Sequence, residues 1–231
     1  MSGPSDQEGV LSMEKLMEGK PSQLEPEDLS EDDLAVLRYA PTSARVVRGC
    51  MLTHGNLDSN AALVIKQCRL TQEDVVMGVL PFFAAYGQTC VMNASIKAGA
   101  CMVLHESFIP GEVLKSLQHD KVTVFFGVPT MYVYILNHPL IYQYDLSSVR
   151  LWVCGGAPIS RETLERWNNE IGSPIYEGYG LTEASPVVSM PPLDGTYKLG
   201  SIGIPGEGIE VKVVDDEGRE LEPGEVGELI V

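Results

Sequence analysis

The chain has 231 residues, 44% of them hydrophobic, which is enough for one sizeable domain or two small ones and argues against wholesale disorder. Its 16 basic and 32 acidic residues give a net charge of −16, which argues against general nucleic-acid binding because that requires a basic surface. The acidity lies at the ends: residues 1–37 carry −8 and residues 207–231 carry −7, whereas the residues between them sum to −1.

Several absences point to a cytoplasmic protein. The five cysteines show no paired spacing, and the start of the chain has neither the basic segment nor the apolar run of a secretory signal. The longest apolar stretches, such as 79–86, are much shorter than the ~20 residues that span a bilayer. We therefore expect reduced, mostly buried thiols and no transmembrane segment.

The first 33 residues are acidic and proline-containing, which predicts a mobile segment with one short helix near residues 11–18. A solvated linker and an interaction tail are both compatible with this composition. Strand-like and helix-like runs then alternate as far as residue 195. The predicted strands are 34–39, 74–80, 101–105, 122–126, 149–154 and 175–179, and the predicted helices are 57–69 (capped by Asn56), 83–98, 110–119, 131–137 and 158–171. This alternation predicts an α/β fold with a mostly parallel sheet covered by helices.

The pattern changes after about residue 195. Residues 209–214 alternate in polarity, residues 216–219 form a turn signal, and residues 226–231 read as a second strand. This predicts an antiparallel β-hairpin. Because the last predicted strand runs to the final residue without a stop signal, we expect the chain to be cut there.

Two predicted strand ends carry residues suited to ligand binding, and ligands of open parallel sheets bind at the carboxyl ends of strands. Gly155 and Gly156 follow the strand 149–154, and residues without side chains let a flat ring lie against the backbone. Tyr179, Thr182 and Glu183 offer an aromatic face, a hydroxyl and a carboxylate, which can stack a base, bind phosphate and hold Mg²⁺. For either segment alone, an ordinary glycine-containing turn is the alternative.

The segment Tyr179-Gly180-Leu181-Thr182-Glu183 resembles the YGxTE signature of adenylate-forming enzymes, most closely that of long-chain fatty-acid–CoA ligases (acyl-CoA synthetases). Further segments are similar to the family in order and spacing, namely 51–57, 80–87, 127–132, 145–150, 200–206 and 224–231. The resemblance covers residues 30–231. It implies the central part of the family's large domain, with an AMP-binding core over 34–195 and the start of a β-barrel-like subdomain over 196–231.

The family activates a carboxylic acid, which attacks the α-phosphorus of ATP to give an acyl-adenylate and pyrophosphate, and the thiol of coenzyme A then displaces AMP. The resemblance therefore implies ATP or AMP, Mg²⁺, coenzyme A and a fatty acid as ligands. Thr182 and Glu183 would be the catalytic residues, with Thr182 bonding phosphate and Glu183 holding the metal. The implied nucleotide-binding residues are Thr42, Ser43, Arg48, Gly155, Gly156, Ala157, Pro158, Gly178, Tyr179, Gly180, Leu181 and Thr182, and the residues implied to border the acyl pocket are Phe83, Tyr86 and Gly87.

The phosphate loop, residues 39–49, departs from the family pattern. Thr42 and Arg45 stand where the family has its two internal glycines. Glycine backbone reaches φ > 0 and approaches phosphate closely, so one interpretation is a loop that no longer cradles ATP. The other is that the hydroxyls of Thr42 and Ser43 and the guanidinium of Arg48 still meet phosphate.

The resemblance also implies that the family's amino-terminal part, its ribose-binding aspartate and its lysine-bearing carboxyl-terminal domain lie outside this sequence. We therefore expect the chain alone to be inactive. Three interpretations stay open. The chain is a fragment or degenerate member of the ligase family, whose activity would need a complementing chain; or it is a non-catalytic interaction or regulatory module; or it is a truncated gene product. Apolar surface exposed at incomplete edges predicts self-association.

Overall fold

The structure is a computed structural model that describes residues 13–20, 25, 27–40 and 48–231. The chain divides into two compact units, residues 1–30 and residues 31–231. The described part of the first unit contains one short helix, α1 (Met13–Met17), inside the segment for which the sequence predicts one. The second unit holds the sheets and the other helices.

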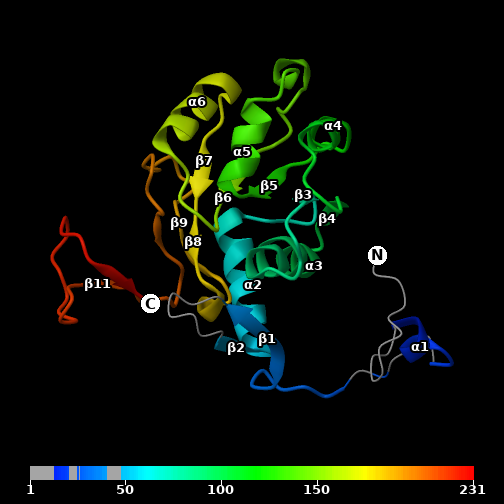
Figure 1. Cartoon of the computed structure of the whole chain (residues 1–231), viewed down its shortest axis with the longest axis vertical. Helices are drawn as coiled ribbons and strands as arrows, with labels where there is room; N and C mark the ends of the chain where they lie inside the picture. Colours follow the sequence, from blue (N-terminus) through cyan, green and yellow to red (C-terminus); the bar gives the residue numbers. More distant parts are fainter. Residues whose placement is uncertain (1–12, 21–24, 26, 41–47) are drawn as a thin grey trace. The chain divides into compact units, whose positions relative to one another are not determined.

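A five-stranded parallel sheet forms the centre of the second unit, with the strand order β4–β3–β5–β6–β7 (Figure 1). The strands are β3 (Val75–Gly78), β4 (Cys101–Leu104), β5 (Val124–Gly127), β6 (Leu151–Cys154) and β7 (Ile175–Glu177). The strands β5 and β6 are apolar and buried along their whole length, as parallel strands covered on both faces are. The predicted α/β fold with a mostly parallel sheet is confirmed.

Helices cover this sheet on both faces. The crossovers between strands contain α4 (Pro110–His119), α5 (Pro129–Leu136) and α6 (Arg161–Ile171), and the segments η1 (Gly87–Asn93) and α3 (Ala94–Ala98) join β3 to β4. The longest helix, α2 (His54–Cys68), precedes β3 and packs against η1 and α3. In Figure 1, α4, α5 and α6 lie together in the upper part of the view, and α2 and α3 lie below them.

Aromatic side chains connect the sheet to its two helical layers. Phe125 and Phe126 are neighbours in β5, so their side chains point to opposite faces of the sheet. Phe125 packs edge-to-face on Tyr132 of α5 with ring centroids 5.7 Å apart, whereas Phe126 packs on Tyr86, 6.2 Å away, at the start of η1. Burial on both faces makes β5 a rigid base for whatever binds at its end.

Several predicted helix boundaries need correction. The helix α5 begins at Pro129 and not at residue 131, and α6 begins at Arg161 and not at residue 158. The N-cap of α2 is Thr53, not Asn56: Asn56 N–H donates to Thr53 Oγ1 at 3.2 Å and Thr53 N–H donates to Asn56 Oδ1 at 3.0 Å, a capping box. The predicted helix over 83–98 is realised as η1 and α3, because residues 81–84 form a turn closed by the bond from Ala84 N–H to Pro81 O at 3.0 Å. Gly87 permits this turn, since a Cβ there would lie 2.3 Å from Pro81 O.

Three small antiparallel sheets complete the second unit. They consist of β1 (Leu34–Ala40) with β2 (Arg48–Thr53); β8 (Tyr179–Gly180), β9 (Val187–Met190) and β10 (Ile204–Pro205); and β11 (Lys212–Val214) with β12 (Glu228–Ile230). The last pair confirms the predicted carboxyl-terminal hairpin. The strand β2 was not predicted. No helix in the described part of the chain is long and apolar enough to cross a membrane.

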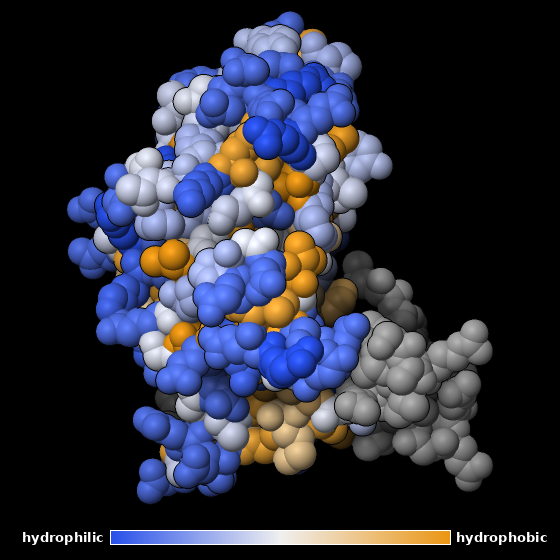
Figure 2. Space-filling model, turned by 90° about the vertical axis from the view of Figure 1, so that its left-hand side faces the viewer, coloured by the Kyte–Doolittle hydropathy of each residue, from blue (hydrophilic) through white to orange (hydrophobic). Residues whose placement is uncertain are grey.

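The β1–β2 hairpin has one apolar face that its neighbours leave uncovered. Leu37 lies opposite Met51, and Tyr39 lies two residues beyond Leu37, so the three side chains share this face. Their side chains are exposed by 49%, 67% and 66% for Leu37, Met51 and Tyr39. Figure 2 shows such apolar patches within a mostly hydrophilic surface. This face is consistent with self-association, which stays a prediction.

Candidate nucleotide-binding site

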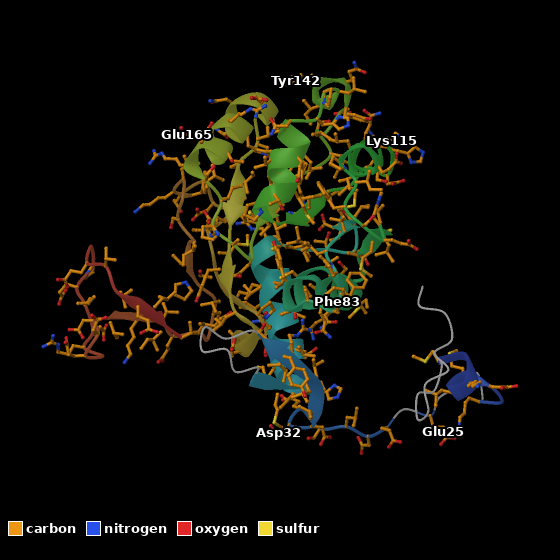
Figure 3. The ribbon with its side chains drawn as sticks, viewed as in Figure 1. Glu25, Asp32, Phe83, Lys115, Tyr142 and Glu165 are labelled. Atoms are coloured by element: carbon orange, nitrogen blue, oxygen red, sulfur yellow. The ribbon has the colours of Figure 1, made fainter. Side chains whose placement is uncertain are left out.

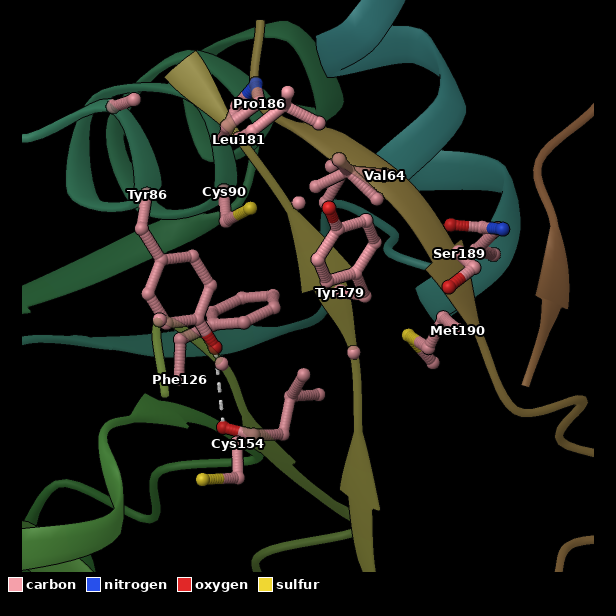
Figure 4. A pocket seen from close by; sticks show the side chains of 18 of the residues that line it. Val64, Tyr86, Cys90, Phe126, Cys154, Tyr179, Leu181, Pro186, Ser189 and Met190 are labelled. Atoms are coloured by element: carbon pink, nitrogen blue, oxygen red, sulfur yellow. Dashed lines mark hydrogen bonds between the residues drawn. The ribbon is translucent and has the colours of Figure 1, made fainter. Parts of the chain in front are cut away.

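A cavity of about 270 Å³ opens at the carboxyl edge of the parallel sheet (Figure 4). The chain leaves β3 for β4 on one side and then returns to β5 on the other side, so the direction of winding reverses between β3 and β5. Such a reversal separates the loops at the ends of the two strands and is where open α/β sheets bind ligands. The cavity is lined by the loop after β3 and by the ends of β5, β6 and β7.

One side of the cavity is the end of β6, residues 153–156, which we call the glycine wall. Gly155 N–H donates to Gly127 O at 3.1 Å, and Gly178 N–H donates to Cys154 O at 2.8 Å, so backbone bonds join this wall to the strand on each side. Gly156 has φ +82°, a conformation that favours glycine. The result is a surface with little side chain, against which a flat ring can lie.

The opposite side is formed by residues 178–182, which we call the tyrosine wall. Its strand β8 pairs antiparallel with β9, with Tyr179 opposite Ser189. Gly180 passes so close to the following turn that a Cβ would lie 2.3 Å from Pro186 O. Thr182 begins the short 3-10 turn η3 (Thr182–Ala184). In Figure 4 the rings of Tyr179 and Tyr86 enter the cavity from different sides.

The floor of the cavity is rich in sulfur. Cys68, Cys90, Cys154 and Met190 line it and are all buried, and Cys68 Sγ lies 3.8 Å from Met190 Sδ. Burial raises the pKa of the Cys68 thiol to about 12 and also raises the pKa values of Cys90 and Cys154. These thiols are therefore protonated at neutral pH and act as apolar lining, not as nucleophiles.

Tyr86 closes the cavity beside the glycine wall. Its hydroxyl donates to Val153 O at 3.2 Å, the dashed line in Figure 4, and Tyr132 donates to the same oxygen at 2.7 Å. Burial raises the pKa of the Tyr86 hydroxyl, which stays protonated and keeps this bond. A Cβ on Gly155 would lie 3.1 Å from Tyr86 Cζ, so the missing side chain makes room for the ring.

Half of the site residues expected from the resemblance line this one cavity. The cavity is lined by Tyr86, Gly155, Gly156, Gly178, Tyr179, Gly180, Leu181 and Thr182. Ala157 and Pro158 are exposed just past the glycine wall, and Gly87 is buried behind Tyr86. Phe83 is 85% exposed and does not line the cavity (Figure 3).

The residues expected to meet phosphate and metal are divided in the structure. Glu183 does not line the cavity of Thr182 but a neighbouring hollow of about 720 Å³, between the amino end of α2 and residues 207–210. Thr42 and Ser43 lie outside the described residues; the backbone of Arg48 begins β2, and its side chain is not described. Among the described residues, no group of three or more His, Cys, Asp or Glu side chains could hold a metal ion. Glu183 alone still fits Mg²⁺, because that ion often takes one carboxylate together with substrate phosphates.

Sequence reasoning missed two buried polar residues behind the tyrosine wall. Asn60 of α2 is 6% exposed and Thr89 of η1 is 1% exposed. Asn60 lies on the same helix face as Ala61, Val64 and Cys68, which are also buried. A polar residue in this apolar row was the signal that could have identified it, since buried polar side chains need partners.

Comparison with known proteins identifies the family to which the chain belongs. Residues 2–231 match the family described as AMP-binding enzyme, and the chain belongs to that family. A long-chain-fatty-acid–CoA ligase of Bacillus subtilis (strain 168) is 40% identical over 208 residues, which are 87% of this chain and 36% of the relative. A feruloyl-CoA synthase of Amycolatopsis sp is 38% identical over 214 residues, which are 90% of this chain and 43% of the relative.

A solved structure agrees with the fold. ATP-bound MatB from Rhodopseudomonas palustris superposes with a TM-score of 0.85 and 30% identity, over 91% of this chain and 42% of that chain. The resemblance to acyl-CoA synthetases inferred from the motifs is confirmed. The chain spans about two fifths of the length of the curated relatives it matches.

Proposed function

We propose that the cavity binds adenine nucleotide and that the chain provides the acid-activating site of an AMP-forming acyl-CoA ligase. The observation that carries this proposal is the meeting of the glycine wall and the tyrosine wall in one cavity at the carboxyl edge of the parallel sheet. The two walls come from separate strands, and each carries the groups that a nucleotide requires. A pair of unrelated glycine turns would not be expected to line the same cavity.

The two walls divide the recognition of the nucleotide between them. Adenine lies against the backbone of Gly155 and Gly156, with the ring of Tyr179 on its other side. The Thr182 hydroxyl donates to a phosphate oxygen, and Glu183 holds Mg²⁺, which neutralises phosphate charge when it is bound. The protein's own contribution is to orient the acid and the α-phosphorus, since this chemistry depends mainly on positioning and charge stabilisation.

The acid occupies the part of the cavity beside Tyr86, above the sulfur-rich floor. The apolar lining and the protonated thiols suit a hydrocarbon group. We propose a fatty acid as the acid and coenzyme A as the acceptor of the acyl group. The name of the Bacillus subtilis relative supports the fatty acid, while the name of the feruloyl-CoA synthase marks an aromatic acid as the competing substrate.

Calorimetric titration of the purified chain with Mg·ATP tests the nucleotide site. Tyr179→Ala removes the proposed stacking face and should weaken binding by about tenfold, since stacking of a base on an aromatic ring contributes ~1–3 kcal/mol. Tyr134→Ala is the matched control, because Tyr134 is 60% exposed on α5 and does not line the cavity. Absence of binding to the unaltered chain, or equal affinities of the two variants, would contradict the proposal.

Activity is tested separately. Pyrophosphate release from ATP with a fatty acid, with and without added coenzyme A, measures acid activation by this chain. Release that depends on the acid supports the ligase assignment. Binding of Mg·ATP without release is the result expected if a complementing chain must supply the rest of the ligase, and release by this chain alone would contradict the expectation that it is inactive.

A further inference from the structure

The turn 181–187 carries Thr182 and Glu183, yet those two side chains do not hold themselves in place. Within the described residues, neither side chain makes a hydrogen bond or an ion pair. The backbone of the turn makes three internal bonds: Leu181 N–H donates to Pro186 O at 2.9 Å, Ala184 N–H to Leu181 O at 3.0 Å and Ser185 N–H to Thr182 O at 3.1 Å. The direction in which Thr182 and Glu183 point therefore depends on what fixes the backbone of the turn.

Asn60 binds that backbone with its whole carboxamide. Its Nδ2 donates to Ala184 O at 3.1 Å and to Val187 O at 2.9 Å, and its Oδ1 accepts from Val187 N–H at 3.1 Å. A buried carboxamide has two donor hydrogens and one acceptor oxygen, and all of them are used here. Because Asn60 lies in the middle of the rigid helix α2, these bonds attach the turn to the body of the domain.

Thr89 adds a second attachment from a different element. Its Oγ1 donates to Ser185 O at 2.9 Å, and the side chain is 1% exposed in η1. Residues 184, 185 and 187 are thus bonded by side chains from two helical segments on one side of the turn. The glycine wall is held mainly by backbone bonds to its neighbouring strands, and the hydroxyls of Tyr86 and Tyr132 bind its first residue at Val153 O.

We propose that Asn60 and Thr89 are positioning residues for the phosphate-binding and metal-binding side chains of the turn. This rests on the proposed function, in which Thr182 meets phosphate and Glu183 holds Mg²⁺. Asn60 and Thr89 touch neither nucleotide nor metal; they set where the turn presents the two side chains. Their removal leaves the adenine surface of the glycine wall in place and moves the groups that bind phosphate and metal.

The ratio of two affinities separates positioning from general stability. Adenosine has the base without phosphate or metal, whereas Mg·ATP uses both parts of the site. Thr89→Val removes the hydroxyl at nearly constant shape and should weaken Mg·ATP about fivefold to tenfold, with adenosine affinity within twofold of the unaltered chain. Thr89→Ser keeps the hydroxyl and should restore Mg·ATP affinity. Asn60→Leu should exceed the effect of Thr89→Val, because it removes three bonds at once.

Thr123→Val is the control for the loss of a half-buried hydroxyl elsewhere in the domain. Thr123 Oγ1 donates to Asp74 Oδ1 at 2.7 Å, next to β3 and far along the chain from the turn. It should lower the melting temperature and leave the Mg·ATP-to-adenosine ratio unchanged. Titration calorimetry for Mg·ATP and ligand-detected NMR for adenosine provide the affinities, and circular dichroism shows that each variant is folded.

Three results would overturn the inference. Equal weakening of adenosine and Mg·ATP in Thr89→Val would reduce Thr89 to a structural role, and so would a lower melting temperature with both affinities unchanged. No rescue by Thr89→Ser would mean that the hydroxyl is not what matters. If the unaltered chain binds neither adenosine nor Mg·ATP, the proposed function itself fails and the inference fails with it, a result distinct from the other three.

Discussion

The two walls of the cavity are held in place in different ways. The glycine wall continues the parallel sheet, with backbone bonds from Gly155 to Gly127 and from Gly178 to Cys154. The tyrosine wall shares the bond at Gly178 and has a short pairing with β9, and the turn that follows it is also held by the side chains of Asn60 and Thr89. The first wall can therefore move only if the sheet does, whereas the loss of one distant side chain can displace the turn that follows the second wall.

The largest expected change is a fall in the free energy of unfolding when the parallel sheet itself is weakened. At its amino edge, the buried Asp74 accepts bonds from Arg150 Nε and Nη2, each at 2.8 Å. Arg150→Leu leaves this carboxylate without its charge partner and should lower the free energy of unfolding by about 3 kcal/mol in urea titrations. Mg·ATP affinity should be unchanged where the variant is folded, because neither wall depends on this pair locally.

Arg161→Leu is the control for that variant. Arg161 pairs with Glu165 one turn along α6, and both side chains are exposed, so its loss should change the free energy of unfolding by less than about 0.5 kcal/mol. Equal effects of the two substitutions would show that the Asp74–Arg150 pair does not stabilise the sheet.

Acid should weaken the sheet in a defined pH range. Burial alone would raise the pKa of Asp74, but hydrogen bonds from Arg150, Thr123 and Thr71 outweigh it and lower the pKa to about 2. Because the folded pKa lies below the unfolded value of about 4, the carboxylate contributes about 2 kcal/mol above pH ~4, and this is lost as the pH falls from ~4 to ~2. Urea titrations across this range should show a shallower fall in stability for Asp74→Asn; the same slope in both proteins would contradict the assignment.

A smaller, local effect should follow from a methyl group on the tyrosine wall. A Cβ on Gly180 would lie 2.3 Å from Pro186 O, whereas a Cβ on Gly178 would meet Ser189 O at 3.3 Å. Gly180→Ala should therefore cost about 1–2 kcal/mol of stability and weaken Mg·ATP binding by about tenfold, and Gly178→Ala should do much less of both. Matching affinities for the two variants would show that the close approach of the turn to β8 is not needed for binding.

The smallest effect concerns the glycine wall, where two hydroxyls share one acceptor. Tyr132 donates to Val153 O at 2.7 Å and Tyr86 donates to it at 3.2 Å. Either tyrosine can be replaced by phenylalanine without orphaning that oxygen, so Tyr132→Phe should cost about 1 kcal/mol and Tyr86→Phe about 0.5 kcal/mol. Thermal unfolding orders the two variants, and a larger loss for Tyr86→Phe would show that the wall depends on the longer bond.

The sequence predicted those features of the fold and the site that a short local motif signals. The helix α4 runs from Pro110 to His119 as predicted, because proline at its start is a local signal. Both walls were also predicted, since each is a short continuous motif beside a strand. The attachments of the turn were not, because their partners are distant: Asn60 and Val187 are 127 residues apart in the chain. The periodicity of neighbouring residues does not predict contacts between residues that are far apart in the chain. The strand β2 was missed although it directly follows β1, because its start lies in residues 39–49, which were interpreted as a phosphate loop.

Amide hydrogen exchange with and without Mg·ATP tests the central claim most directly, because it reports where on the chain the nucleotide binds. The account predicts slower exchange in both the glycine wall, 153–156, and the tyrosine wall, 178–182, with the remaining amides of the turn 181–187 also protected. The strands β11 and β12 should exchange at unchanged rates. Protection confined to one wall, or found only outside the two, would contradict a nucleotide site between them.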